Sequence, residues 1–334
     1  MAKDRSKKRY DNLVLIGVGE YAKVYSAEDT KLGRSVAVKR VRKQYLDDKE
    51  KLSRYWKEAQ LLVDVEHPNI LTIYDLMKSK GCLVLELMKG NLKQIYGNRP
   101  MPVKDIREML LQVARGLECL HKNEITHGDV KPENLMLSRQ DVVKLGDFGL
   151  ARRASDEEVS LLKGTTKYMA PELVSEDFGE VGTASDLYSL GFSALELMIG
   201  PQFDSLFPDL IAFGSDKQMA WMMWHCSADR KFPPIQTILE GVPDDLAKVL
   251  QKLTEKPQSD RYQSAKELID DLTGGTKLIG EAIRDDEAEA NELAKKKKRK
   301  RRIKAAVACC ISLMLCGVIF WAIQEPPPKP VAKV

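Results

Sequence analysis

Three side chains that can act on a phosphate group lie within six positions of the sequence. The stretch ITHGDVKPENLML, residues 125–137, places a carboxylate at Asp129, an ammonium at Lys131 and a carboxamide at Asn134. Phosphoryl transfer needs in-line positioning of the reactants and neutralisation of charge on the phosphoryl oxygens. A carboxylate can receive the proton of an attacking hydroxyl, and an ammonium can lie beside the moving phosphoryl group. The stretch therefore indicates a phosphoryl-transfer site.

A second carboxylate follows at Asp147, in the sequence KLGDFGL. The glycines that flank it permit an unusual turn of the backbone. Together with Asn134, Asp147 offers the hard oxygen ligands by which Mg²⁺ is usually held next to substrate phosphates. Each of these residues alone is explained equally well by a capped turn or a solvated loop. Their order and spacing together favour a metal-assisted phosphoryl-transfer site.

Two glycines near the N-terminus indicate where the phosphates of a nucleotide would lie. A dinucleotide-binding fingerprint would need a helix directly afterwards and an acidic residue about 20 positions on. A β-like run follows instead, and position 39 is a lysine within VAVK. Taken alone, this arrangement is typical of an ordinary glycine-containing hairpin and a lysine that faces solvent. It also fits a hairpin over the phosphates and a strand lysine that reaches them, with Glu58 on the next predicted helix as the partner of Lys39. The expected ATP-binding hairpin consists of Gly17, Val18, Gly19, Glu20, Tyr21, Ala22, Lys23 and Val24.

These residues require two structural regions that meet at a cleft. Short β-like runs separated by turns fill residues 10–45, a helical pattern covers 47–64, and two more β-like runs follow. From residue 103 onward the pattern is mainly helical. We therefore expect an α+β chain with a small β-rich lobe and a larger helical lobe, joined near Glu86–Gly90.

With these motifs in order, residues 10–272 resemble the eukaryotic-type protein kinases. GVGEYAKV resembles the glycine-rich loop, with Ala22 in place of the third glycine, and HGDVKPEN resembles the catalytic loop. GTTKYMAPE and SDLYSLG match two later segments, and Arg261 is the expected partner of Glu172. The resemblance implies a bilobal fold, ATP and Mg²⁺ as cofactors and protein substrates. It also implies that Leu85 is the gatekeeper and that Glu86 to Met88 form the hinge that bonds adenine.

Further details of the motifs resemble the serine/threonine class of kinases. Lys131, two residues after Asp129, and Thr165 in GTTKYMAPE are typical of that class. Gly128 departs from the family pattern, in which an arginine usually holds a phosphorylated activation-loop residue by charge-assisted hydrogen bonds. We therefore expect activity that does not strictly depend on phosphorylation of the activation loop. Its candidate acceptors are Ser155, Ser160, Thr165 and Thr166.

The C-terminal part of the sequence predicts a membrane anchor. Residues 305–323 contain no charged side chain and, as a helix, would extend about 28 Å, close to the thickness of a bilayer's hydrocarbon core. The cationic run KKKKRKRR at 295–302 precedes them and predicts a cytoplasmic N-terminal side and contact with anionic lipid. We expect a charged linker at 273–304, a transmembrane helix at 305–323 and a proline-rich tail at 324–334 outside. A stripe of small residues could allow the helix to form a homodimer.

The charge of the chain argues against nucleic acid as a partner. The net charge is +4, but the cationic run before the apolar segment accounts for more than this excess and leaves the remainder mildly acidic. A membrane-anchored serine/threonine kinase, similar to the bacterial receptor-like type, is the favoured function. A tail-anchored eukaryotic kinase is the alternative source. A pseudokinase or nucleotide-binding membrane scaffold and a small-molecule kinase remain as alternative functions.

Overall fold

The computed structural model describes most of residues 8–274. The described residues are 8–19, 21–46, 48, 52–53, 55–56, 59–60, 65–153, 165–207, 210 and 216–274. The chain divides into two units, Met1–Thr273 and Gly274–Val334, and the elements below belong to the first.

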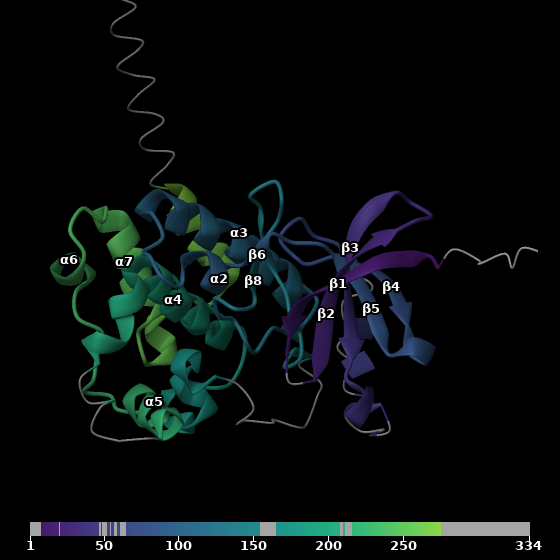
Figure 1. Ribbon diagram of the computed structural model, residues 1–334. Coiled ribbons are helices and arrows are strands. Elements are labelled where there is room, and N and C mark those ends of the chain that lie inside the picture. Colours follow the sequence, from purple (N-terminus) through teal and green to yellow (C-terminus); the bar gives the residue numbers. More distant parts are fainter. Residues whose placement is uncertain are drawn as a thin grey trace, which may run out of the picture. The chain divides into compact units, whose positions relative to one another are not determined.

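An antiparallel five-stranded sheet forms the first region of the fold, in the order β1-β2-β3-β5-β4 (Figure 1). Its strands are β1 (Tyr10–Val18), β2 (Ala22–Asp29), β3 (Arg34–Val41), β4 (Ile73–Met77) and β5 (Cys82–Glu86). Because side chains alternate along a strand, Val36 and Val38 pack on one face of the sheet and Val41 on the other. Lys39 alternates in step with Val41, so its side chain lies on the face of the sheet that packs against Tyr55, Trp56 and Ala59.

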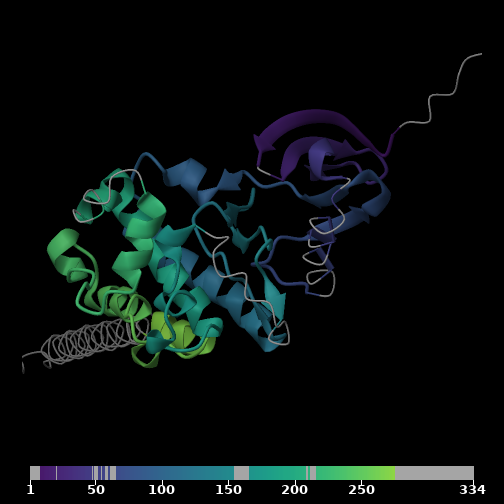
Figure 2. The ribbon, with the colours of Figure 1, turned by 90° about the horizontal axis from the view of Figure 1, so that it is seen from below.

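The second region is mainly helical. Its helices are α2 (Leu92–Tyr96), α3 (Val103–Lys122), α4 (Thr183–Ile199), α5 (Lys217–His225), α6 (Ile235–Ile238), α7 (Asp244–Leu253) and helical residues 265–273. Short 3-10 turns occur at Lys43–Tyr45, Lys78–Lys80, Thr166–Tyr168, Pro171–Leu173, Glu176–Phe178, Gly200–Leu206 and Gln258–Asp260. Figure 2 shows these helices gathered away from the five-stranded sheet. The predicted α+β, bilobal architecture is therefore confirmed.

Two small sheets of short strands flank the loops that contain the predicted site residues of the helical region. One small sheet has the order β6-β8-β9 and the other pairs β10 with β7. The strands are β6 (Gly90–Asn91), β7 (Ile125–Thr126), β8 (Leu135–Leu137), β9 (Val143–Leu145) and β10 (Arg152–Arg153). The catalytic-type stretch runs between β7 and β8, and Asp147 follows β9 by two residues. These ladders fix the two loops at their ends.

Helix α4 lies at the centre of the helical core. Every residue from Ala184 to Ile199 is buried, including the carboxylates of Asp186 and Glu196. Charged groups inside a protein require partners, because the loss of water is otherwise too costly. The partners of these two carboxylates belong to the site described below.

None of the helices formed by the described residues combines the length and apolar character needed to cross a bilayer. The predicted transmembrane segment, 305–323, lies outside those residues, as does almost all of the predicted linker.

The expected pair between Glu172 and Arg261 is a buried, two-pronged ion pair. Arg261 Nη1 donates to Glu172 Oε1 at 2.8 Å and Nη2 donates to Oε2 at 2.6 Å, and neither side chain is exposed. Arg261 also donates to the backbone oxygens of Glu255 and Lys256. It therefore ties the segment after Pro171 to the turn before the last helical residues.

Replacement of Arg261 by methionine should destabilise the fold strongly. Removing one partner of a buried pair leaves an uncompensated charge and costs about 3–5 kcal/mol. We expect the free energy of unfolding of Arg261→Met, measured by urea denaturation with tryptophan fluorescence, to fall by that amount. Lys266→Met removes one partner of the exposed Lys266–Asp270 pair and should leave the stability almost unchanged. Equal effects of the two substitutions would contradict the prediction.

Candidate active site

The three polar residues of the catalytic-type stretch converge on one another. Lys131 Nζ lies 2.8 Å from Asp129 Oδ2, and Asn134 Nδ2 donates to the same oxygen at 2.8 Å and to the Asp129 carbonyl at 2.8 Å. Lys131 also donates to Thr165 Oγ1 at 3.2 Å. Thr165 is 34 residues further along the chain, so this contact joins the catalytic-type loop to the segment GTTKYMAPE.

Asp186 on α4 fixes the backbone of that loop. Its Oδ1 accepts the N–H of Gly128 at 2.8 Å, and its Oδ2 accepts the N–H of His127 at 2.9 Å. His121 Nε2 lies 2.9 Å from Oδ2. Burial by itself would raise the pKa of Asp186, but the His121 side chain and the Gly128 N–H outweigh burial and hold the pKa below its ordinary value. The carboxylate thus remains charged and anchors the residue directly before Asp129.

Lys39 from the sheet and Asp147 from the helical region meet as an ion pair. Lys39 Nζ lies 2.8 Å from Asp147 Oδ1, although 108 residues separate them in the sequence. The charge of Lys39 lowers the pKa of Asp147 below its ordinary value, and Lys131 and His127 act in the same direction. Asp147 is therefore influenced by cations from both lobes, and the two predicted carboxylates share the neighbourhood of Lys131.

The backbone makes an unusual turn between the two glycines, and the residue that takes the left-handed conformation is Asp147 itself. Among the described residues with positive φ, Asp147 itself has φ of 55° and neither Gly146 nor Gly149 is included. Aspartate tolerates this left-handed region better than most residues. The next side chain, Phe148, is buried and contacts the His127 ring at 4.8 Å between centroids. The turn therefore directs Asp147 toward Lys39 while Phe148 packs in the core.

The predicted glycine-rich hairpin forms between β1 and β2. Gly17 pairs with Val24, Val18 pairs with Lys23, and the Gly19 N–H donates to the Ala22 carbonyl at 2.8 Å. Tyr21 lies at the tip with about half of its side chain exposed. On β3, Lys39 pairs with Val24, which places the lysine directly across from the end of the hairpin.

An ion pair joins the predicted hinge to β9, the strand that precedes Asp147. Glu86 Oε2 accepts a hydrogen bond from Lys144 Nζ at 2.7 Å, and both side chains are largely buried. Within the described part of the chain, neither the N–H nor the carbonyl of Met88 has a hydrogen-bond partner. These backbone groups could therefore pair with the edge of an adenine ring. Leu85, the predicted gatekeeper, precedes the hinge at the end of β5 and pairs with Ala37.

Comparison with known proteins accounts for this combination of fold and loops. The protein kinase domain family matches residues 10–272. The chain belongs to the protein kinase family.

Its relatives include bacterial serine/threonine kinases. PrkC of Bacillus subtilis, a serine/threonine-protein kinase, is 31% identical over 271 residues, which cover 79% of this chain and 40% of PrkC. The serine/threonine-protein kinase PknB of Mycobacterium leprae is 33% identical over 277 residues, covering 79% of this chain and 42% of PknB. A probable serine/threonine-protein kinase of Clostridium perfringens is 31% identical over 271 residues, 79% of this chain and 38% of that protein. The chain thus matches about two fifths of the length of these relatives.

Some predicted site residues of this kinase lie outside the described part of the chain. They are Glu20 in the hairpin, Glu58 as the partner of Lys39, and Ser155 and Ser160 in the activation loop. Thr166, the remaining predicted activation-loop position, is buried at the start of the turn Thr166–Tyr168.

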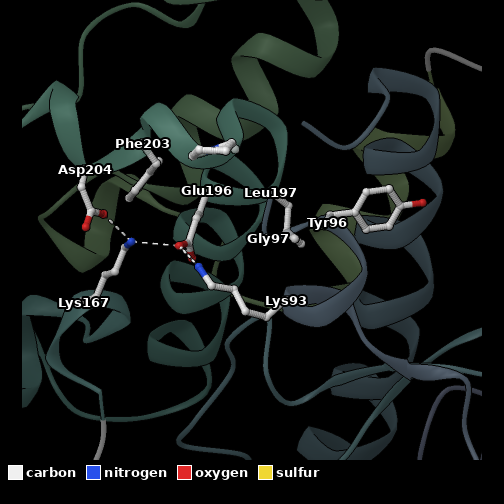
Figure 3. A pocket seen from close by; sticks show the side chains of 10 residues that line it. Lys93, Tyr96, Gly97, Lys167, Glu196, Leu197, Phe203 and Asp204 are labelled. Atoms are coloured by element: carbon white, nitrogen blue, oxygen red, sulfur yellow. Dashed lines mark hydrogen bonds and ion pairs between the residues drawn. The ribbon is translucent and has the colours of Figure 1, made fainter. Parts of the chain in front are cut away.

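Next to the kinase's catalytic loop, a cavity of about 280 Å³ lies between α2, the end of α4 and residue Lys167 (Figure 3). Glu196 Oε1 accepts from Lys93 at 2.6 Å and from Lys167 at 2.9 Å, and Tyr168 donates its hydroxyl to Oε2. Lys167 also pairs with Asp204 at 2.5 Å. The Lys93 N–H donates to the Pro132 carbonyl, so this network begins at the catalytic loop itself.

Sequence reasoning did not find the network around Glu196, nor the role of Asp186 as the anchor of the catalytic loop. The sequence does mark both residues, because they are the two acids in the otherwise apolar or small-residue run TASDLYSLGFSALELMI. A charge within such a buried run requires a specific partner. The identity of the partners is not readable, since Lys93 and Lys167 lie 103 and 29 residues from Glu196.

Proposed function

We propose that this protein transfers the γ-phosphate of ATP to serine or threonine hydroxyls of other proteins. The observation that carries the proposal is the convergence of Lys39, Lys131, Asp129 and Asp147 from both lobes. Lys39 and Asp147 are 2.8 Å apart, Lys131 and Asp129 are 2.8 Å apart, and Lys131 also lowers the pKa of Asp147. Two carboxylates and two ammonium groups in one place suit a reaction that moves a highly charged phosphoryl group.

In the proposed reaction, the Asp129 carboxylate receives the proton of the substrate hydroxyl. The hydroxyl oxygen forms a bond to the γ-phosphorus while the bond between that phosphorus and the bridging oxygen breaks, and ADP leaves. Lys131, held between Asp129 and Thr165, lies where it can neutralise charge on the transferred group. Lys39 would orient the other phosphates, and the hinge backbone at Met88 would bond the adenine.

The donor set fits Mg²⁺. Asp147 is ionised because Lys39 lowers the pKa of its carboxyl, and Asn134 retains a carboxamide oxygen while its nitrogen donates to Asp129. Mg²⁺ binds through one or two such protein oxygens, phosphate oxygens and water. Bound between Asp147 and Asn134, Mg²⁺ would neutralise charge on the triphosphate.

The assignment of the proposed kinase to the serine/threonine class is supported by Lys131, by Thr165 and by the names of its relatives. Lys131 joins the catalytic loop to Thr165, and the segment that follows is held by the Glu196 network. A fixed segment at this place would give an extended peptide a surface on which to present its hydroxyl to Asp129. The names of the relatives, serine/threonine-protein kinases, agree with this choice.

Activity should depend on a divalent cation and on Asp129. The full chain, incubated with radiolabelled ATP, MgCl₂ and casein, should transfer phosphate to serine and threonine. Because Asp129 receives the hydroxyl proton, Asp129→Ala should reduce kcat by at least about 10²-fold, as loss of a general base does. Addition of EDTA should remove the activity.

Measurements of ATP binding distinguish an active kinase from a nucleotide-binding scaffold. Asp129→Ala should still bind ATP, since Asp129 contacts the hydroxyl and not the adenine, whereas Lys39→Met should weaken binding. Wild-type protein that binds ATP but transfers no phosphate would reject the kinase proposal and support the nucleotide-binding scaffold.

Phosphorylation of Ser155 and Ser160 should be dispensable for activity. Gly128 has no side chain to hold a phosphate, and a Cβ atom there would lie 2.9 Å from the Leu150 carbonyl oxygen at φ of 74°. We expect the Ser155→Ala/Ser160→Ala double variant to keep kcat toward casein within about twofold. Gly128→Arg should lower activity, because the added side chain strains a backbone that Asp186 holds in place. Loss of activity in the double alanine variant would reject the prediction.

We also propose that residues 305–323 anchor the kinase in a membrane, with the kinase domain in the cytoplasm and residues 324–334 on the other side. The support is the uncharged run itself and the eight cations at 295–302 that precede it. Anionic lipid headgroups would attract these cations by about 1 kcal/mol each. A homodimer through the same helix is part of this proposal.

Carbonate extraction of membranes tests the anchor. The full chain expressed in bacteria should remain in the membrane pellet at alkaline pH, whereas a chain truncated after Ala294 should be released. A variant with glutamine at Lys295, Lys296, Lys297 and Lys298 controls for purely electrostatic attachment and should stay in the pellet. Release of the full chain would reject the transmembrane proposal.

A further inference from the structure

The tip of the glycine-rich hairpin is attached to the segment that follows β3. The Arg42 N–H donates to the Tyr21 carbonyl at 2.9 Å, just beyond the last β2–β3 pair, Ala22 with Val41. This bond holds the backbone of the tip one residue before β2 begins. The hairpin is therefore fastened at its tip as well as along its strands.

A ring contact reinforces this attachment. The rings of Tyr21 and Tyr45 lie 5.3 Å apart between centroids, with 47° between their planes. Tilted aromatic pairs at such separations stabilise a contact by about twofold to tenfold in an equilibrium constant, beyond the burial of their area. Tyr21 is still 47% exposed, so the contact with Tyr45 covers one side of a residue that solvent also reaches.

Tyr45 is itself held by the core that supports Lys39. It packs against the cluster of Val41, Tyr55, Trp56, Ala59 and Leu83. Within that cluster, Tyr55 donates its hydroxyl to the Lys39 carbonyl at 3.2 Å. Tyr45 therefore contacts both the tip of the hairpin and the cluster that supports the strand of Lys39.

We propose that Tyr45 is a positioning residue for nucleotide binding. Through its ring it holds the Tyr21 tip in a fixed position relative to Lys39, so that the hairpin backbone and the lysine ammonium meet the same triphosphate. Without the contact, ATP must order the tip on binding, and that loss of chain entropy weakens the affinity. This inference rests on the proposed nucleotide site and adds to it a residue outside the glycine-rich motif.

Calorimetric titration of the full chain with AMP-PNP and MgCl₂ tests the inference. Tyr45→Leu should raise the dissociation constant about threefold to tenfold, and Tyr45→Phe should raise it less, because phenylalanine keeps the contact between the rings. Tyr45→Leu should also raise the KM for ATP without changing the KM for casein. Tyr25→Leu is the matched control, since Tyr25 lies on β2 and has no ring partner among the described residues.

The coupling between the two tyrosines decides whether they act as a pair. Tyr21→Leu should also weaken binding, and the loss in the Tyr21→Leu/Tyr45→Leu double variant should be clearly smaller than the sum of the two single losses in free energy. Because Tyr21 is exposed at a loop tip, Tyr21→Leu tests the pair even if Tyr45→Leu unfolds. Additive losses, or an unchanged dissociation constant in both single variants, would overturn the inference. Failure of the wild type to bind AMP-PNP would instead overturn the nucleotide site itself.

Discussion

The active site depends on two carboxylates that are buried in one helix. Asp186 lies near the start of α4 and Glu196 in its last turn, and both are almost fully buried. A charge in such a place is tolerated only if donors surround it. The donors of Asp186 are backbone N–H groups of the catalytic loop and the His121 side chain, and those of Glu196 are Lys93, Lys167 and Tyr168. The need to satisfy these charges therefore fixes the loops that flank the chemistry.

The carboxylates at the two ends of α4 need different numbers of charged partners. An acid near the N-terminus of a helix is stabilised by the helix dipole, whereas an acid in the last turn is destabilised by it. Asp186 accordingly needs few charged partners, while Glu196 is met by two lysines. These lysines come from α2 and from the segment after Thr165. Burial of Glu196 thus holds that segment against the rest of the helical lobe, beside the loop that carries Asp129.

The sequence predicted the parts of the site better than their contacts. Residue types and spacing were enough to predict Asp129, Lys131, Asn134 and Asp147 as members of one site, because phosphoryl transfer restricts which groups can act together; their roles in that reaction stay a prediction. The two lobes followed from the change of hydrophobic periodicity. The ion pair of Lys39 with Asp147 was not derivable, since it joins positions 108 residues apart on different lobes. The positive φ falls on Asp147 and not on the glycines beside it, although local propensity favours glycine for such a conformation.

The departure at Gly128 follows from the same anchoring by Asp186. Residue 128 contributes its N–H to Asp186 Oδ1, and its φ of 74° places the position of a Cβ against the Leu150 carbonyl. Glycine adopts this conformation without strain, whereas a residue with a side chain needs compensating contacts. An arginine there would obtain such contacts from a phosphate. Here two N–H groups, from His127 and Gly128, bind one buried carboxylate and define where Asp129 begins, with no side chain at residue 128.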